Sequence, residues 1–328
     1  MPLPNSGQIS LNDIATEFGG SAPHALSEYY SKGNAPASGE IQIGADFYGT
    51  SASYSINFLV LAGGGGGGNR FAASGAGAGG LRTSTQTVDA GTVITCNVGA
   101  GGSGGTTNAH GGYGGTSTIS GSGLTTIQSA GGAGGVSYDT GVSPDYYAFD
   151  GGCGSGSIQG RPAGQGNVPS VSPSQGNNGG GSAGTTGPNS GQGGGGGGNG
   201  SVGDTGSNSS GHEAGGGNGS VSNITGSSVT YGGGGGAAGR GGTREGPGGS
   251  GGGGPAGTGT AGTPGTANLG AGGGATDSNS GGGSGGSGVV ILSLPTSNYS
   301  GTTTGSPTVT TSGSNTILKF TGSGSYTA

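Results

Sequence analysis

The chain has 328 residues, of which 97 are glycine, 26% are hydrophobic and only 6% are charged. So small an apolar fraction excludes one large conventional core, and apolar burial must be local. The formal net charge is −6, with only 7 Lys and Arg residues along the whole chain. No basic stripe is therefore present, and we expect no nucleic-acid partner.

The start of the sequence has neither the basic region nor the apolar core of a signal peptide. It also lacks the run of about 18 apolar residues that a membrane-spanning helix needs. We therefore expect neither classical secretion nor membrane insertion.

Residues 1–50 differ in composition from the rest, because acidic, aliphatic and aromatic residues recur there and glycine mostly stands singly. Ser10 is placed to cap a short helix that runs through Phe18 and ends at the following glycines. Residues 25–31 form a second candidate helix. So few apolar groups make a marginal core. We interpret the segment as a small attachment or oligomerisation module.

The sequence of residues 51–130 predicts antiparallel β-structure. Residues 54–61 alternate apolar side chains before a run of six glycines, which predicts a strand that ends there. Stretches rich in Thr, Val and Ile separated by glycine-rich turns predict further strands, at 85–88, 92–98, 116–119 and 124–128.

Strand signals almost vanish over residues 131–288 and return in residues 289–328. The apolar run 288–294 predicts a strand, and residues 307–311 and 316–321 predict a hairpin across a Ser-Gly-Ser-Asn turn. The predicted fold is therefore mainly β: an antiparallel β-sandwich in which the closing strands pair with the opening ones. Residues 131–288 would be a long insertion into it.

A flexible linker is the simplest interpretation of glycine and serine runs. A linker joins two bodies, however, whereas this segment leaves and re-enters one predicted domain. Collagen is excluded because glycine does not recur at every third position. The remaining hypothesis is a polyglycine II bundle, in which three-residue-per-turn helices pack side by side and only glycine fits between neighbours. Backbone hydrogen bonds of about 0.5 to 1.5 kcal/mol each would offset the entropic cost.

Motifs for catalysis or metal binding are missing from the sequence. The histidines lie far apart without ligand spacing, and the abundant Gly-x-Gly-x-x-Gly matches follow from composition. Asp139, Asp145 and Asp150 cluster, but acids in a loop are usually just solvated. Nothing in the spacing of Cys96 and Cys153 demands a bridge, so we expect free thiols. We expect no enzymatic activity, no cofactor and no metal.

Several segments resemble the glycine-rich domain of phage tail-fibre proteins. They are INFLVLAGGGG at 56–66, GAGGLR at 77–82, VGAGGSGG at 98–105, GGSGVVIL at 285–292, GSPTVT at 305–310 and KFTGSGSY at 319–326. The opening GQISLNDI at 7–14 resembles a short module that recurs in structural proteins of tailed phages.

The resemblance implies a virion protein at the tail fibre or tail tip. Residues 1–50 would bind other tail proteins, and the body would bind a bacterial surface receptor, either a glycan or an outer-membrane protein. The protein would be a homo-oligomer, with a trimer as one candidate state.

Receptor contacts are expected where side chains interrupt the glycine pattern, because rigid loops with aromatic or Arg anchors bind at little entropic cost. Residues 136–150 concentrate aromatic side chains that suit sugar rings or a protein loop, although they would serve equally to cover the glycine segments. The candidates are Tyr138, Tyr146, Tyr147, Phe149, His110, Tyr113, Arg161, His212, Tyr231, Arg240 and Arg244.

Two other functions fit the composition. A purely structural fibre or sheath subunit would bury the aromatic loop at a subunit contact and would polymerise. An ice-binding protein would use a flat polyglycine face, but the irregular spacing of Ser, Thr and Asn argues against it.

Overall fold

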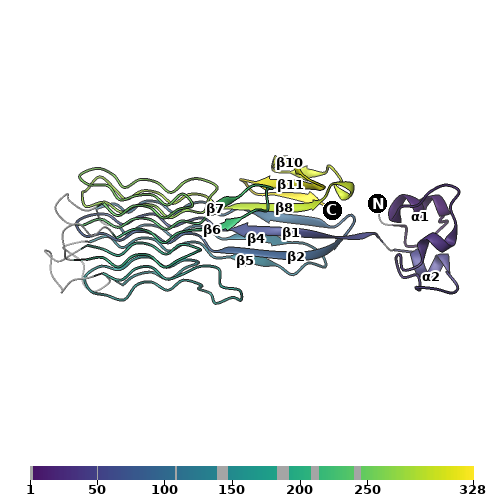
Figure 1. The fold of residues 1–328 in the computed structure, drawn as a ribbon, viewed down its shortest axis with the longest axis horizontal. Coiled ribbons are helices and arrows are strands. Elements are labelled where there is room, and N and C mark those ends of the chain that lie inside the picture. Colours follow the sequence, from purple (N-terminus) through teal and green to yellow (C-terminus); the bar gives the residue numbers. More distant parts are fainter. Residues whose placement is uncertain are drawn as a thin grey trace.

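The structure is a computed structural model that describes residues 3–49, 51–107, 109–138, 147–182, 192–207, 214–239 and 245–328. Figure 1 shows three parts in a row: a small helical part, a body of β-strands, and an array of extended segments at the far end. The predicted mainly β, antiparallel fold is confirmed.

Residues 3–49 contain helix α1 (Leu11–Phe18), a 3₁₀ turn (Leu26–Tyr29) and helix α2 (Ile43–Phe47). The predicted cap of α1 is confirmed: the Ser10 side chain accepts from the Asp13 amide at 3.2 Å, and the Asp13 carboxylate accepts from the Ser10 amide at 2.7 Å. The second predicted helix is only the 3₁₀ turn, and α2 has no counterpart in the prediction.

The helical part has its own small core, separate from the core of the β-strands. Its buried side chains are Leu3, Ile14, Tyr29, Ala35 and Phe47. The Phe47 ring lies edge-on to the Tyr29 ring, with ring centroids 6.3 Å apart.

Two five-stranded antiparallel sheets make up the β body within the described residues. Sheet A has the order β10-β11-β8-β1-β2, and sheet B has the order β5-β4-β3-β12-β9. The strands of sheet A are β1 (Ser53–Leu61), β2 (Leu81–Asp89), β8 (Val289–Pro295), β10 (Thr308–Ser312) and β11 (Asn315–Phe320). Those of sheet B are β3 (Val93–Asn97), β4 (Ser117–Ser120), β5 (Ile127–Ser129), β9 (Thr303–Thr304) and β12 (Gly324–Thr327). A 3₁₀ turn (Thr296–Asn298) follows β8.

The closing strands pair with the opening ones, as the sequence predicts. Strand β8 is antiparallel to β1, with Ile291 opposite Leu59, and β12 is antiparallel to β3, with Tyr326 opposite Ile94. The β body therefore forms only when the two ends of a long chain meet.

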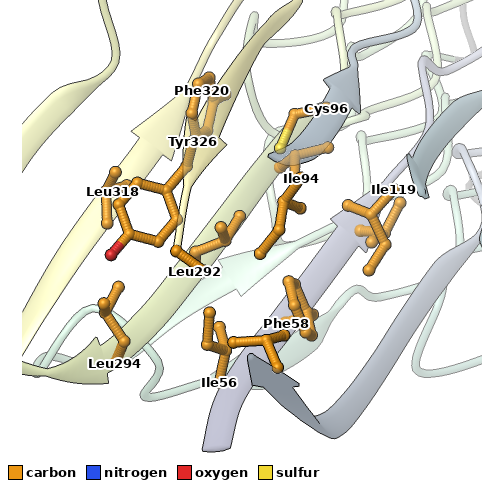
Figure 2. Packing of buried hydrophobic residues seen from close by; sticks show 14 of the residues in the cluster. Ile56, Phe58, Ile94, Cys96, Ile119, Leu292, Leu294, Leu318, Phe320 and Tyr326 are labelled. Atoms are coloured by element: carbon orange, nitrogen blue, oxygen red, sulfur yellow. The ribbon is translucent and has the colours of Figure 1, made fainter. Parts of the chain in front are cut away.

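The two sheets share one hydrophobic core. Alternate residues of the central strands point inward, so that Phe58 and Leu292 of sheet A lie beside Ile94, Cys96 and Tyr326 of sheet B (Figure 2). Each fully buried large aliphatic or aromatic side chain stabilises the fold by about 1.5 to 3 kcal/mol. This cluster holds most of the large apolar side chains of the body, so it is the main hydrophobic stabilisation of the fold.

The glycine-rich segments lie side by side and are held by backbone hydrogen bonds between segments (Figure 1). The amides of Gly63, Gly64 and Gly65 donate to three different segments, at Gly115, Gly286 and Gly77. The next three amides repeat the cycle, donating to the same segments at Gly112, Gly283 and Ser74. The bonding pattern of this segment therefore has a period of three residues.

The same six residues accept hydrogen bonds from three further segments. The carbonyls of Gly63 and Gly66 accept from Gly132 and Gly135, and the other four accept from Gly102, Gly105, Gly273 and Thr276. Residues 63–68 are thus surrounded by six neighbouring segments. We call the set of segments held in this way the glycine array.

Close approach explains why glycine dominates the array. A β-carbon on Gly66 would overlap the carbonyl of Ser103, and one on Gly64 would overlap the carbonyl of Ala271. Some buried positions of the array are alanine, however. Four of them meet in a small cluster: Ala73, Ala238, Ala256 and Ala275. The four methyl groups of this cluster pack against one another.

A short hairpin, β6 (Ser220–Ser222) and β7 (Val229–Tyr231), lies within the region that the sequence left without strands. It packs on the outer face of sheet A, where Tyr231 joins Leu59, Ile291 and Ile317 in a second apolar cluster. Figure 1 shows it where the array meets the β body.

Candidate functional site

The side chains that interrupt the array gather where its segments turn, away from the sheets. Residues 63–68 lead directly out of β1, so residues 69–71 lie at the distal end of the array. Residues 131–136 run outward in the same way after β5, and Tyr138 follows them. We use the name distal surface for the aromatic and Arg side chains of these turns and of the array segments beside them. They are Arg70, Phe71, His110, Tyr113, Tyr138, Tyr147, Phe149 and Arg161.

Phe71 and Tyr138 form one part of the distal surface. Their ring centroids are 5.4 Å apart in an edge-on arrangement, and the Arg70 guanidinium carbon lies 5.3 Å from the centre of the Phe71 ring. Tyr138 is only 8% exposed and packs on Val136 and Ile158. Its ring therefore supports the distal surface by packing beneath it and is little accessible to a partner.

The turn that carries Phe71 is held in a strained backbone conformation. Arg70 has φ 77° and Phe71 has φ 49°, values that cost non-glycine residues about 1 to 3 kcal/mol each. The Phe71 amide donates to the Asp277 carbonyl at 3.0 Å. A neighbouring segment thus helps to fix the aromatic ring in place.

His110, Tyr113 and Phe149 form a second part. The Phe149 ring centroid lies 5.2 Å from that of His110 and 5.7 Å from that of Tyr113. His110 Nδ1 accepts from the Ser137 amide at 2.9 Å, so this nitrogen carries no proton. Tyr113 is 54% exposed. Partial burial and then the negative charge of Asp150 raise the pKa of its hydroxyl, which stays a hydrogen-bond donor at neutral pH.

Tyr147 and Arg161 form a third part. The Arg161 guanidinium carbon lies 5.0 Å from the centre of the Tyr147 ring, and Nη1 donates to the Tyr147 hydroxyl at 3.4 Å. Tyr147 is 56% exposed. A cation over an aromatic face contributes about 0.5 to 1 kcal/mol at exposed sites, which favours one orientation of both side chains.

One predicted candidate lies elsewhere. Tyr231 is 1% exposed in the cluster between β7 and sheet A, and burial raises the pKa of its hydroxyl. It serves packing at the junction of the array and the β body, and we leave it out of the distal surface. Four candidates lie outside the described residues: Tyr146, His212, Arg240 and Arg244.

The sequence prediction missed Arg70 and Phe71. The signal was present, because they directly follow a six-glycine run and Asn69, and so interrupt the array as the predicted residues do. The residues that the structure brings together are Phe71 with Tyr138, Phe149 with His110 and Tyr113, and Tyr147 with Arg161. Their partnership depends on which segments lie side by side.

The described residues contain no cluster of three or more His, Cys, Asp or Glu side chains suited to a metal ion. Of the acidic cluster, Asp150 accepts from the Gln165 amide at 2.6 Å, while Asp139 and Asp145 lie outside the described residues.

Cys96 and Cys153 are both free, as predicted, and both are buried. Burial raises the pKa of each thiol to about 12, so neither is a nucleophile at neutral pH.

A family model described as a glycine-rich domain matches residues 42–295, which is most of the chain. The chain belongs to this glycine-rich domain family. The match spans β1 to β8, and so includes the array and the strands that lead into and out of it. No curated protein matches the chain in sequence. Among the described helices, none has the length and apolar character needed to cross a membrane.

Proposed function

We propose that the protein is a non-catalytic adhesin of a phage virion, located at the tail fibre or tail tip, and that its distal surface binds a bacterial surface receptor. The observation that carries this proposal is the gathering of aromatic and Arg side chains on the distal surface, where Tyr113 and Tyr147 are more than half exposed and Arg161 lies over the Tyr147 ring. The resemblance of residues 56–66 and 285–292 to phage tail-fibre proteins supports the virion assignment.

The array is a polyglycine II bundle in this proposal, and it acts as a stiff support. Three-residue-per-turn extended helices have no internal hydrogen bonds, so each amide is available to a neighbour. The period of three in the bonds from residues 63–68 fits that helix, and six neighbours around one segment fit hexagonal packing. A stiff support reduces the entropy lost when a partner binds.

We assign the receptor contacts to Tyr113 and Tyr147, the two exposed members of the distal surface, and to the half-buried Arg161 beside Tyr147. Aromatic faces stack on the C–H face of a sugar ring or pack against a protein loop, and the guanidinium adds directed donors. Tyr138 and Phe71 pack in one apolar cluster with Phe149, whose ring contacts Tyr113. Residues 3–49 have a core of their own, which supports the assignment of residues 1–50 to attachment within the tail or to self-association.

The test is adsorption of fluorescently labelled protein to a panel of bacterial strains. A variant with Tyr113→Ser and Tyr147→Ser removes exposed rings without disturbing buried packing, and Val202→Ser, at a 57% exposed position outside the distal surface, is the matched control. We expect strain-selective binding that the double variant loses and the control keeps. Equal binding by all three proteins, or binding to no strain, would overturn the adhesin proposal.

A structural fibre subunit is the second candidate function, and one observation favours it. Strand β10 is an edge of sheet A, its five residues carry no charge, and Val309 is 41% exposed. Uncharged exposed edges pair readily with other strands. If Val309→Lys abolished filaments that form on concentration, while the double tyrosine variant had no phenotype, the structural function would replace the adhesin.

A further inference from the structure

A groove separates the β6–β7 hairpin from the outer face of sheet A. Its volume is about 440 Å³, within the usual size of small-ligand sites, about 300 to 1,000 Å³. Its floor is one row across four adjacent strands, in which Thr85, Asn57, Ser293 and Ile317 lie opposite one another in register. The groove lies where the array meets the β body, away from the distal surface.

The hairpin forms the opposite wall, and its position is fixed at both ends. Tyr231 anchors one end in the apolar cluster on sheet A. At the other end the turn residue Gly226 lies against the Ser312 side chain of β10. The groove therefore exists before any ligand binds, and a ligand need not pay to form it.

Two asparagine side chains of this groove have their carbonyl oxygens already hydrogen-bonded. Asn57 Oδ1 accepts from the Thr85 hydroxyl at 2.6 Å, and Asn223 Oδ1 accepts from the Ser228 hydroxyl at 2.7 Å. Because a hydroxyl already occupies each carbonyl oxygen, the NH₂ group of each amide is directed elsewhere and has two hydrogens to donate. Both residues line the groove, one from the floor and one from the hairpin.

The remaining lining determines the class of ligand. None of the lining residues is charged, so nothing in the groove neutralises an anion or a cation. Ile224 supplies an apolar contact, while Asn315 and several hydroxyls supply further polar atoms. The floor is the face of a sheet and presents side chains, so the floor offers a peptide backbone no strand edge to pair with.

From these features we propose that the groove is a second binding site, and that its ligand is a short neutral saccharide. Ring and hydroxyl oxygens accept from the amide groups of Asn57 and Asn223, and the C–H face of a sugar ring packs on Ile224. This site is independent of the distal surface and would give the protein two separate contacts with a glycan-coated surface.

The probe is an array of neutral oligosaccharides and their sialylated and sulfated counterparts, read with the labelled full chain. Asn57→Asp keeps the shape and the oxygen that accepts from Thr85, but replaces the NH₂ donor with a charged oxygen. We expect binding to selected neutral oligosaccharides, reduced about tenfold or more in this variant, the loss of one to two hydrogen bonds. Asn12→Asp, at an exposed position on α1, is the matched control and should bind as the unaltered chain does.

The two sites are separated by the double variant Tyr113→Ser and Tyr147→Ser, which should keep the neutral-saccharide binding in full. The proposal is overturned if no neutral oligosaccharide binds, if Asn57→Asp and Asn12→Asp bind equally, or if charged glycans bind as tightly as neutral ones. Displacement of the glycan by a peptide library, with loss of peptide binding in Asn57→Asp, would assign the groove to a peptide instead.

Discussion

The amide of Gly66 donates to the carbonyl oxygen of Gly112 at 2.9 Å, across a contact so close that a β-carbon on Gly66 would overlap a third segment at Ser103. Hydrogen bonding and steric exclusion thus act on the same residue. The hydrogen bonds hold the array only because the segments lie at glycine–glycine distance, and that distance admits no side chain at this position.

Gly66→Ala should therefore destabilise the protein strongly. The new methyl group meets backbone from a rigid neighbour, so relief requires segments to separate, and we expect a loss of about 3 kcal/mol or more in the free energy of unfolding. Gly322→Ala is the control, since a β-carbon there meets nothing within 4 Å. Denaturant-induced unfolding of both variants measures their free energies of unfolding. Equal values for the two variants would contradict the close packing of residues 63–68.

The cap of α1 should make the helical part sensitive to acid. Hydrogen bonds from the Ser10 backbone and then from its hydroxyl lower the pKa of Asp13 below its ordinary value of 3.8. A lowered pKa means that the charged carboxylate stabilises the folded state above that ordinary value, and that this contribution is lost as the pH falls through the folded value.

Hydrogen exchange of the amides in residues 11–18 measures this effect. At neutral pH the unaltered chain should show greater protection than Asp13→Asn, and the difference should disappear as the pH falls below 3.8. A difference that persists unchanged in acid would show that the carboxylate does not act through the cap.

Much of the β body follows from local sequence. The apolar alternation before a glycine run identifies β1 and the apolar run at 289–294 identifies β8, because these strands are bounded by residues that cannot continue them. Helix α1 is predictable for the same reason, since Ser10 and Gly19 mark its ends.

Other elements depend on contacts that the sequence does not display. Ser220–Ser222 is too short and polar to signal a strand, and it pairs because Tyr231 anchors its partner strand against sheet A. The sequence also does not show which array segments are neighbours, because segments of nearly the same composition could occupy one another's places in the array. Phe71 and Tyr138 meet for that reason without any sequence signal for the pair.

The two thiols provide a chemical test of packing in separate parts of the fold. Cys96 lies in the core between the sheets and Cys153 lies within the array, where the Asn199 amide donates to its sulfur at 3.4 Å. With pKa values of about 12, roughly one thiol in ten thousand is ionised at pH 8. We expect iodoacetamide to label neither in the folded protein and both after unfolding without reductant, as read by mass spectrometry.

Each alternative result has a distinct meaning. Rapid labelling of Cys153 alone in the folded protein would show that the array is open to solvent while the sheets are closed. Failure of both to react after unfolding without reductant would mean that they form a disulfide.

Hydrogen exchange along the glycine segments tests most directly the central claim that an ordered array carries the distal surface. The amides of residues 63–68 each donate to a neighbouring segment, so we expect them to exchange only through cooperative unfolding, with protection that matches the global free energy. Exchange of these amides at the rate of an unstructured chain, while β1 and β8 remain protected, would contradict the array and with it the stiff support on which the proposed binding depends.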